Sequence, residues 1–257
     1  MGQKVHPIGF RIGVTEDWRS RWFAPKAAYA EFLIEDHRIR NLVEQKLNRT
    51  APYAGVSKIE IERTRNEVKV TLSTARPGMV IGPRGAEVDK LREQLEELID
   101  RKVSVSIKEI KNPDLDAQLI ALDISEQLKR RASFRRAMKA KCEAAMSAGA
   151  IGVKIICNGR LGGAEMSRME TQKTGSIPLQ RLQAKVDYGF AASFTTYGAI
   201  GVRVWLYKGL YRDLSEDSQL VETGQAQGGG GEAPSPQEGG RRRPRGDRGA
   251  PAPQQQG

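Results

Sequence analysis

The loop Gly82-Pro83-Arg84-Gly85 and the helix predicted directly after it, over residues 86–99, constrain the fold of this chain more than any other feature. Apolar side chains recur in that segment at three- and four-residue steps, and charged side chains fill the other positions. The apolar stripe consists of Val88, Leu91, Leu95, Leu98 and Ile99. Such a stripe is stable only against an apolar partner, so the segment belongs to a domain with a packed core.

Three strands with alternating apolar and polar residues supply that partner. They are predicted over residues 56–62, 67–72 and 103–107. Arg65-Asn66 lies between the first two strands, which favours a hairpin, and the apolar spacing of residues 29–49 predicts a helix before it. Residues 29–111 are therefore predicted to form an α+β domain, with a three-stranded sheet and helices on one of its faces.

A second α+β domain is predicted over residues 112–210. Asn112-Pro113-Asp114 marks its start, because proline disfavours helical geometry in the residue before it and Asp114 can cap a helix. Helices are expected at about 115–131 and 134–148, and strands at 152–157, about 183–189 and 201–207. Residues 1–28 then form an N-terminal arm. Residues 211–257 form a tail that is predicted to be disordered, because most of it is Gly, Pro, Gln and Arg.

Positive charge is concentrated in the part of the chain that is predicted to fold. Residues 1–210 contain 36 Lys and Arg against 24 Asp and Glu, whereas residues 211–257 contain 6 against 7. A basic folded surface attracts polyanions, either nucleic acid or an anionic membrane. No run approaches the roughly 20 apolar residues of a membrane-spanning helix, so nucleic acid is the expected partner and the cytoplasm the expected location.

The cysteine and histidine content argues against a metal site. Cys142 and Cys157, with only His6 and His37 as further soft ligands, do not make a four-ligand zinc site within one chain. Both cysteines occupy apolar positions and are predicted to be buried thiols. No metal, cofactor or catalytic residue is expected, since no grouping of His, Asp and Glu has a plausible catalytic spacing.

The Gly-x-x-Gly loop itself predicts RNA binding. Its glycines carry no Cβ, so the backbone can approach a sugar-phosphate chain closely, and the following helix directs N–H groups to the same place. The candidate RNA-binding residues are Gly82, Pro83, Arg84, Gly85 and the nearby Arg76. Four residues are a weak pattern in a chain with 27 glycines, and the alternative is that these glycines only turn the chain.

The predicted order of elements around the loop resembles the type II KH domain of bacteria, in which the loop clamps about four nucleotides of single-stranded RNA. Met79-Val80-Ile81 has the apolar character of a strand, whereas the resemblance implies a short helix there. Pro83 departs from the family, whose two middle positions are often basic. Because proline removes one N–H donor and one charge, a weaker clamp is expected.

A second concentration of charge lies between Lys129 and Lys141, where seven cations occur without a carboxylate. The candidate binding residues are Arg131, Arg135, Arg136 and Lys139. In a helix, the four-residue spacing of three of them would place their side chains on one face, while Phe134 and Met138 anchor the other. Such a face suits contact with nucleic-acid phosphates.

Residues 2–23 interleave cations with aromatic rings, a pattern that suits insertion into folded RNA. The predicted ribosomal RNA contacts are Lys4, His6, Arg11, Arg160 and Arg168. Residues 159–165 surround Arg160 with glycines, but no Gly-Lys-Ser or Gly-Lys-Thr closes the segment, which excludes a nucleotide-binding P-loop. The sequence leaves open whether Trp22 and Phe23 face RNA or pack on the protein's own helices.

Five separated motifs, in order over residues 1–209, resemble the family of bacterial small-subunit ribosomal protein three. They are the arm stretches Met1–Pro7, Gly9–Arg11 and Arg21–Phe23, then Ala75–Gly78, Phe134–Lys139, Gly159–Glu165 and Thr195–Gly198. The resemblance implies a protein of the ribosome that contacts small-subunit ribosomal RNA in the head and lines the channel through which messenger RNA enters. It also implies that Arg131, Arg135, Arg136 and Lys139 meet the incoming messenger and help to separate its base pairs.

The same resemblance implies ribosomal proteins ten and fourteen as neighbours, no enzyme activity and no homo-oligomer. The region 171–187 departs from the family, with Ser176 in place of a basic residue and Arg181 as an added one. Two alternative functions are an RNA-processing or GTP-using enzyme that carries a KH domain, and a stand-alone KH regulator of messenger RNA. The missing P-loop argues against the first, and the likeness of residues 114–209 to the ribosomal family argues against the second.

Overall fold

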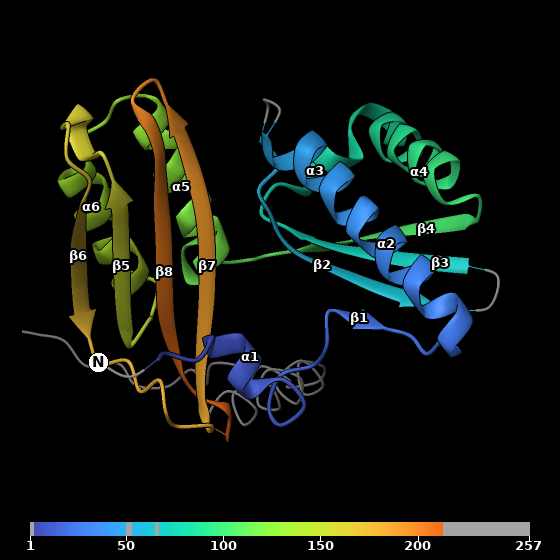
Figure 1. Cartoon of the computed structure of the whole chain (residues 1–257), viewed down its shortest axis with the longest axis horizontal. Helices are drawn as coiled ribbons and strands as arrows, with labels where there is room; N and C mark the ends of the chain where they lie inside the picture. The colour runs from blue at the N-terminus through green and yellow to red at the C-terminus, as the bar shows by residue number, and fades with distance from the viewer. Residues whose placement is uncertain (1–2, 50–52, 65–66, 213–257) are drawn as a thin grey trace, which may run out of the picture. The chain divides into compact units, whose positions relative to one another are not determined.

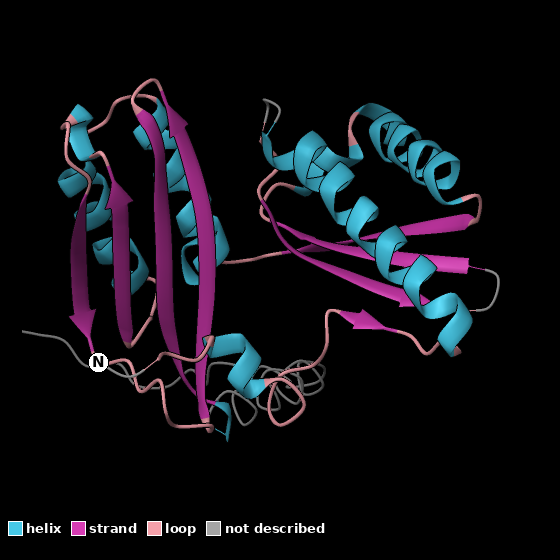
Figure 2. Ribbon diagram, in the orientation of Figure 1, coloured by secondary structure: helices cyan, strands magenta, loops and turns pink. Residues whose placement is uncertain are grey.

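The computed structural model describes residues 3–49, 53–64 and 67–212, which form two four-stranded sheets, each with its own helices and its own hydrophobic core (Figures 1 and 2). The predicted α+β fold is confirmed. The predicted turn at Arg65-Asn66 and residues 213–257 of the predicted tail lie outside the described residues. None of the helices in the described ranges is long and apolar enough to cross a lipid bilayer.

The first sheet has the strand order β1-β2-β3-β4. Its strands are β1 (Ser20–Arg21), β2 (Val56–Arg63), β3 (Glu67–Thr74) and β4 (Lys102–Glu109). β2 and β3 are antiparallel, while β3 and β4 are parallel and therefore need a crossover between them. The prediction of three strands missed β1, which the N-terminal arm adds in parallel to β2 through a bond from the Ile61 amide to the Arg19 carbonyl.

Helices α2 (Lys26–Val43), α3 (Pro77–Ile81) and α4 (Ala86–Ile99) belong to the first sheet, and a π-helical segment, Glu44–Arg49, continues α2. α3 and α4 form the crossover from β3 to β4. The predicted bounds of α4 are confirmed, and Leu91, Leu95 and Ile99 are buried in the core. The interpretation of residues 79–81 as a strand is wrong: they are helical, and Pro77 at the first turn fixes a backbone angle that starts a helix.

The second sheet has the strand order β6-β5-β8-β7, and all neighbours are antiparallel. Its strands are β5 (Gly152–Gly159), β6 (Arg168–Gly175), β7 (Ala184–Thr195) and β8 (Gly198–Leu210). The sequence did not predict β6, because this edge strand has polar or exposed side chains on both faces and so lacks apolar alternation. β7 and β8 are each longer than predicted.

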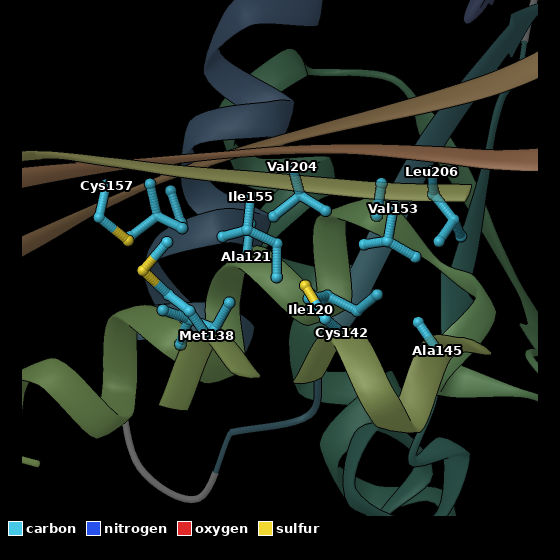
Figure 3. Close-up of a cluster of buried hydrophobic side chains, with 14 of the residues drawn as sticks. Ile120, Ala121, Met138, Cys142, Ala145, Val153, Ile155, Cys157, Val204 and Leu206 are labelled. Carbon is cyan, nitrogen blue, oxygen red and sulfur yellow. The ribbon is translucent and has the colours of Figure 1, made fainter. Parts of the chain in front are cut away.

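Helices α5 (Ala117–Lys129) and α6 (Phe134–Ser147) lie on one face of the second sheet (Figure 1). Side chains from both helices meet those of β5 and β8 in one apolar core (Figure 3). Cys142 and Cys157 lie inside it, and burial raises the pKa of these thiols to about 11 and about 12, which confirms buried, unreactive cysteines. Asp116, not Asp114 as predicted, caps α5, since its Oδ1 accepts the amides of residues 118 and 119.

Candidate nucleic-acid interface

The Gly-x-x-Gly loop has a backbone at Gly82 that leaves no room for a side chain. Gly82 has φ 69° and ψ −178°, and a Cβ added there would lie 2.6 Å from Cγ of Glu87. Arg84 and Gly85 also have positive φ, of 57° and 83°. Pro83 and Arg84 are both exposed. The loop therefore offers solvent an approachable backbone and one cation, which is the geometry expected from its two glycines.

Carboxylates at the start of α4 oppose a phosphate at this loop. Glu87 and Asp89 occupy the first turn, where the helix dipole favours negative groups. Lys90 partly neutralises them, with its Nζ 2.9 Å from Oε1 of Glu87. Arg76 is exposed beside the start of α3. Arg84 is thus the best-placed cation of the loop, and the geometry favours a weak clamp.

Helix α6 separates its cations from its apolar residues. Arg135, Arg136 and Lys139 are exposed, whereas Ala137 and Met138 are buried in the core of the second domain. The exposed side chains lie at steps of three and four residues, so they share one helical face. This arrangement follows from the amphipathic pattern recognised in the sequence.

Arg131 does not join this helical row, which corrects the expected stacking. It lies in the turn between α5 and α6, with a left-handed backbone at φ 60° and its amide bonded to the carbonyl of Leu128. The turn separates the two helices, so the four-residue spacing from Arg131 to Arg135 does not describe one helix. Arg131 is nevertheless exposed in the segment that leads into α6.

Ion pairs divide the basic cluster into structural and available cations. Lys141 is structural: it is half-buried, and its Nζ lies 2.6 Å from Asp123 and 3.4 Å from Asp114. Burial opposes its charge, but these two carboxylates outweigh burial and raise the pKa of Lys141. Lys139 makes only an exposed contact of 3.8 Å with Glu143, and Arg136 has no ion-pair partner within the described ranges.

Arg168, predicted separately as a ribosomal RNA contact, lies beside the start of α6. The guanidinium groups of Arg135 and Arg168 stand 5.5 and 5.6 Å from the ring centre of Phe134. Both also approach Glu170 of β6, at 3.6 and 3.8 Å. We call Arg135, Arg136, Lys139 and Arg168 the α6 basic surface. This proximity was not predictable because β6 was not predicted.

Arg11 contradicts the expectation that it contacts RNA. It lies in helix α1 (Pro7–Arg11) and is fully buried. Its Nε donates to the carbonyl of Ala184 at 2.8 Å, its Nη1 to that of Pro7 at 2.9 Å, and its Nη2 to that of Arg181 at 2.9 Å. A further bond from Nη2 reaches Leu179. The guanidinium is thus enclosed by protein acceptors and holds the arm to the second domain.

The other arm residues differ in how far their side chains bond or pack within the protein. His6 caps α1 by accepting the Gly9 amide and packs edge-on against Tyr188, while burial, and then the charge of Arg19, lowers its pKa. Lys4 is exposed. Trp22 and Phe23 differ in whether they pack on the protein's own helices. Trp22 packs on rings of helix α2 and its Nε1 donates a hydrogen bond to Asp36, whereas the side chain of Phe23 is 94% exposed.

Arg160 fixes a local turn of the second domain. Its Nε donates to the carbonyl of Ala164 at 2.9 Å, and its Nη1 to the carbonyl of Tyr197 at 3.1 Å. The half-buried guanidinium also stands over the Tyr197 ring. Arg160 therefore ties the glycine-rich segment to the turn between β7 and β8, and any contact with RNA would use its remaining donors.

Sequence reasoning missed one further surface, the face of the second sheet opposite α5 and α6. The alternation of β8 could have indicated this face, because Val202, Val204 and Leu206 point into the core and the residues between them must point away from it. No group of three or more His, Cys, Asp or Glu residues in the described ranges is arranged to hold a metal ion.

Comparison with known proteins bears on both domains. Residues 38–115 match the family model "KH domain", and residues 124–206 match "Ribosomal protein S3, C-terminal domain". The small ribosomal subunit protein uS3 of Finegoldia magna is 54% identical over 209 residues, which cover 81% of this chain and 84% of the relative. That of Rhodopirellula baltica is 50% identical over 227 residues, covering 88% and 96%. That of Desulfovibrio desulfuricans is 51% identical over 217 residues, covering 84% and 100%.

Proposed function

The chain belongs to the family of small ribosomal subunit protein uS3, and from this membership we propose that it binds small-subunit ribosomal RNA and lines the channel through which messenger RNA enters. Proteins of this family are structural components of the ribosome rather than enzymes, which places the chain in ribosomes of the cytoplasm. Ribosomal proteins ten and fourteen are proposed as its neighbours in the head.

The α6 basic surface is the observation that carries the channel proposal. Its cations are exposed and their ion pairs are long, so they are available to phosphates. Met138 and Ala137 fasten the same helix to the core, so the surface is rigid. Cations on a rigid helix can hold the phosphates of one messenger strand while translocation pulls on it, and a hairpin then opens without a bound nucleotide.

Binding to ribosomal RNA is proposed for a different set of residues. Arg76 and Arg84 at the Gly-x-x-Gly loop, together with the exposed Lys4, are open to solvent. His6 and Arg160 would contribute only the groups that the protein itself does not use. Because several weak contacts add up, the low affinity expected of the loop is compatible with stable incorporation into a subunit.

The test is a triple variant, Arg135→Ala with Arg136→Ala and Lys139→Ala, in ribosomes that contain no wild-type copy. We expect normal sedimentation with small subunits and slower translation through a stable messenger hairpin, with unchanged speed on an unstructured message. The matched control removes exposed charges from α4, with Lys90→Ala and Arg92→Ala, and leaves both speeds unchanged. Equal speeds of the triple variant and wild type on both messages would overturn the channel role, and failure of the wild type to sediment with subunits would overturn the ribosomal assignment.

A further inference from the structure

The second sheet has one face covered by α5 and α6 and one face that these helices leave uncovered (Figure 2). Side chains of successive strand residues point to opposite faces. Val153, Ile155 and Cys157 of β5 pack under α5 and α6, as do their cross-strand partners in β8. The residues between them therefore point to the other face, which we call the open face. Strand register places Lys154, Trp205 and Tyr188 in one row across it.

Charge on the open face is of one sign. Lys173 of β6 lies opposite Lys154, and Arg203 of β8 lies opposite both Ile156 and Phe190. No Asp or Glu occupies a position on this face in β5, β6, β7 or β8, by the register of these described strands. The carboxylates of these strands, among them Glu170 and Asp187, belong to the helix-covered face.

Aromatic rings are interleaved with these cations. Lys154 stands 5.4 Å from the ring centre of Trp205, and Tyr188 lies 5.4 Å from the same ring on its other side. Phe190 and Phe194 are 48% and 68% exposed. Between them on β7 lies Ala192, and its partner on β8 is Gly201, whose missing side chain leaves space beside the Phe190 ring, 3.7 Å from where a Cβ would lie. The aromatic side chains thus give this face exposed rings with cations between them.

The protein itself covers only one end of this face. There, His6 packs on Tyr188, and Ala184, Val186 and Tyr207 form a small cluster with Ile177. Beyond that end, Phe190, Phe194, Lys173 and Arg203 are exposed.

We propose that the open face binds unpaired nucleotides of RNA, with bases stacked on Phe190, Phe194 and Trp205 and phosphates held by Lys154, Lys173 and Arg203. Nucleobases have flat rings that can stack on the exposed aromatic side chains, and the phosphates of the RNA chain complement a face without carboxylates. An acidic protein partner would match the cations but not the exposed rings between them. This inference rests on the proposed function, because that function supplies the RNA. The site is separate from both the Gly-x-x-Gly loop and the α6 basic surface.

Binding of the full chain to a labelled oligouridine of about ten nucleotides tests the site, with 4-thiouridine in the oligomer for crosslinking. We expect Phe190→Ala with Phe194→Ala to weaken binding about tenfold or more, and Phe194→Trp to retain it, because stacking needs a ring rather than phenylalanine. The matched control Leu33→Ala with Ile34→Ala removes two apolar side chains exposed on α2 and leaves the affinity unchanged. Crosslinks are expected on peptides of β7 and β8.

The cations are tested by Lys154→Gln, Lys173→Gln and Arg203→Gln together, which we expect to weaken binding at least tenfold. Removal of three exposed lysines of the first domain, Lys46, Lys102 and Lys108, keeps the net charge equal and is expected to have a smaller effect. Wild-type affinity of the open-face variants, with a loss only in the α6 triple variant, would overturn the site and leave the proposed function standing. Wild-type affinity combined with failed incorporation into subunits would instead identify a protein as the partner.

Discussion

The N-terminal arm and helix α6 both carry cations, and they use them in opposite ways. Arg11 of the arm is buried among carbonyl groups, and the arm residues Ser20 and Trp22 bind Asp36, which also pairs with the buried Arg63. Arg135 and Lys139 of α6 remain exposed, with ion pairs no shorter than 3.6 Å. A cation enclosed by acceptors contributes to stability, whereas a cation in water stays available for phosphate.

Asp36→Ala is the variant in which we expect the largest effect, because Asp36 pairs with a buried cation. Asp36 is 1% exposed, and its Oδ1 accepts both Nε and Nη2 of Arg63, at 2.9 and 2.7 Å. Removing Asp36 leaves the buried Arg63 with Glu35 as its remaining carboxylate partner and takes the acceptor from Ser20 and Trp22, so we expect a loss of about 3–5 kcal/mol in the free energy of unfolding, measured in urea. Asp17→Ala breaks an exposed pair with Arg21 and is the control, with an expected loss below about 1 kcal/mol. Equal losses in the two variants would contradict the contrast.

Arg11→Met asks whether the arm cation serves the fold or RNA. Methionine retains much of the buried volume but donates to none of the carbonyls that Arg11 binds, so a loss of about 2–4 kcal/mol in unfolding free energy is expected. Lys4→Met, in the exposed part of the arm, should change stability by less than about 0.5 kcal/mol. Unchanged stability with weakened RNA binding in Arg11→Met would restore the original expectation of an RNA contact.

Arg11 and α4 show how far the sequence could predict this molecule. The bounds of α4 were predictable because its apolar stripe is a local pattern. The burial of Arg11 was not predictable, because its acceptors Leu179, Arg181 and Ala184 lie 168 to 173 positions further along the chain and no local pattern records them. The exposed cations of α6 were predictable from amphipathic spacing alone. The proximity of Arg168 to these cations was not predictable, because Arg168 lies on β6 and this edge strand has no apolar face by which to recognise it.

Lys208 is a further cation that pairs within the protein, and its pairing with Asp187 should affect how stability depends on pH. Burial by itself raises the pKa of Asp187, but the charges of Lys208, 3.0 Å away, and of Lys58 outweigh burial and hold this pKa below its ordinary value. A carboxyl with a lowered folded-state pKa adds stability above its unfolded pKa of about 3.9 and loses it as pH falls through the folded value. Urea unfolding from neutral pH down to about pH 2 should therefore show a steeper loss for wild type than for Asp187→Asn. In Lys208→Met the acid-induced loss should be smaller than in wild type, because the folded pKa of Asp187 then moves up toward its unfolded value, and identical acid profiles would show that the pair contributes nothing.

The outward cations of α6 should have the smallest effect on stability and a clear effect on salt dependence. Arg135, Arg136 and Lys139 are exposed, so replacing all three with Ala should change the unfolding free energy by less than about 1 kcal/mol. Each phosphate contact that they make releases a counterion, so the slope of log affinity for single-stranded RNA against log salt should become shallower by about 2. Arg11→Met, measured while folded, should leave that slope unchanged because its guanidinium never reaches solvent. A shallower slope for Arg11→Met, or an unchanged slope for the triple variant, would show that burial does not decide which cations of this protein meet RNA.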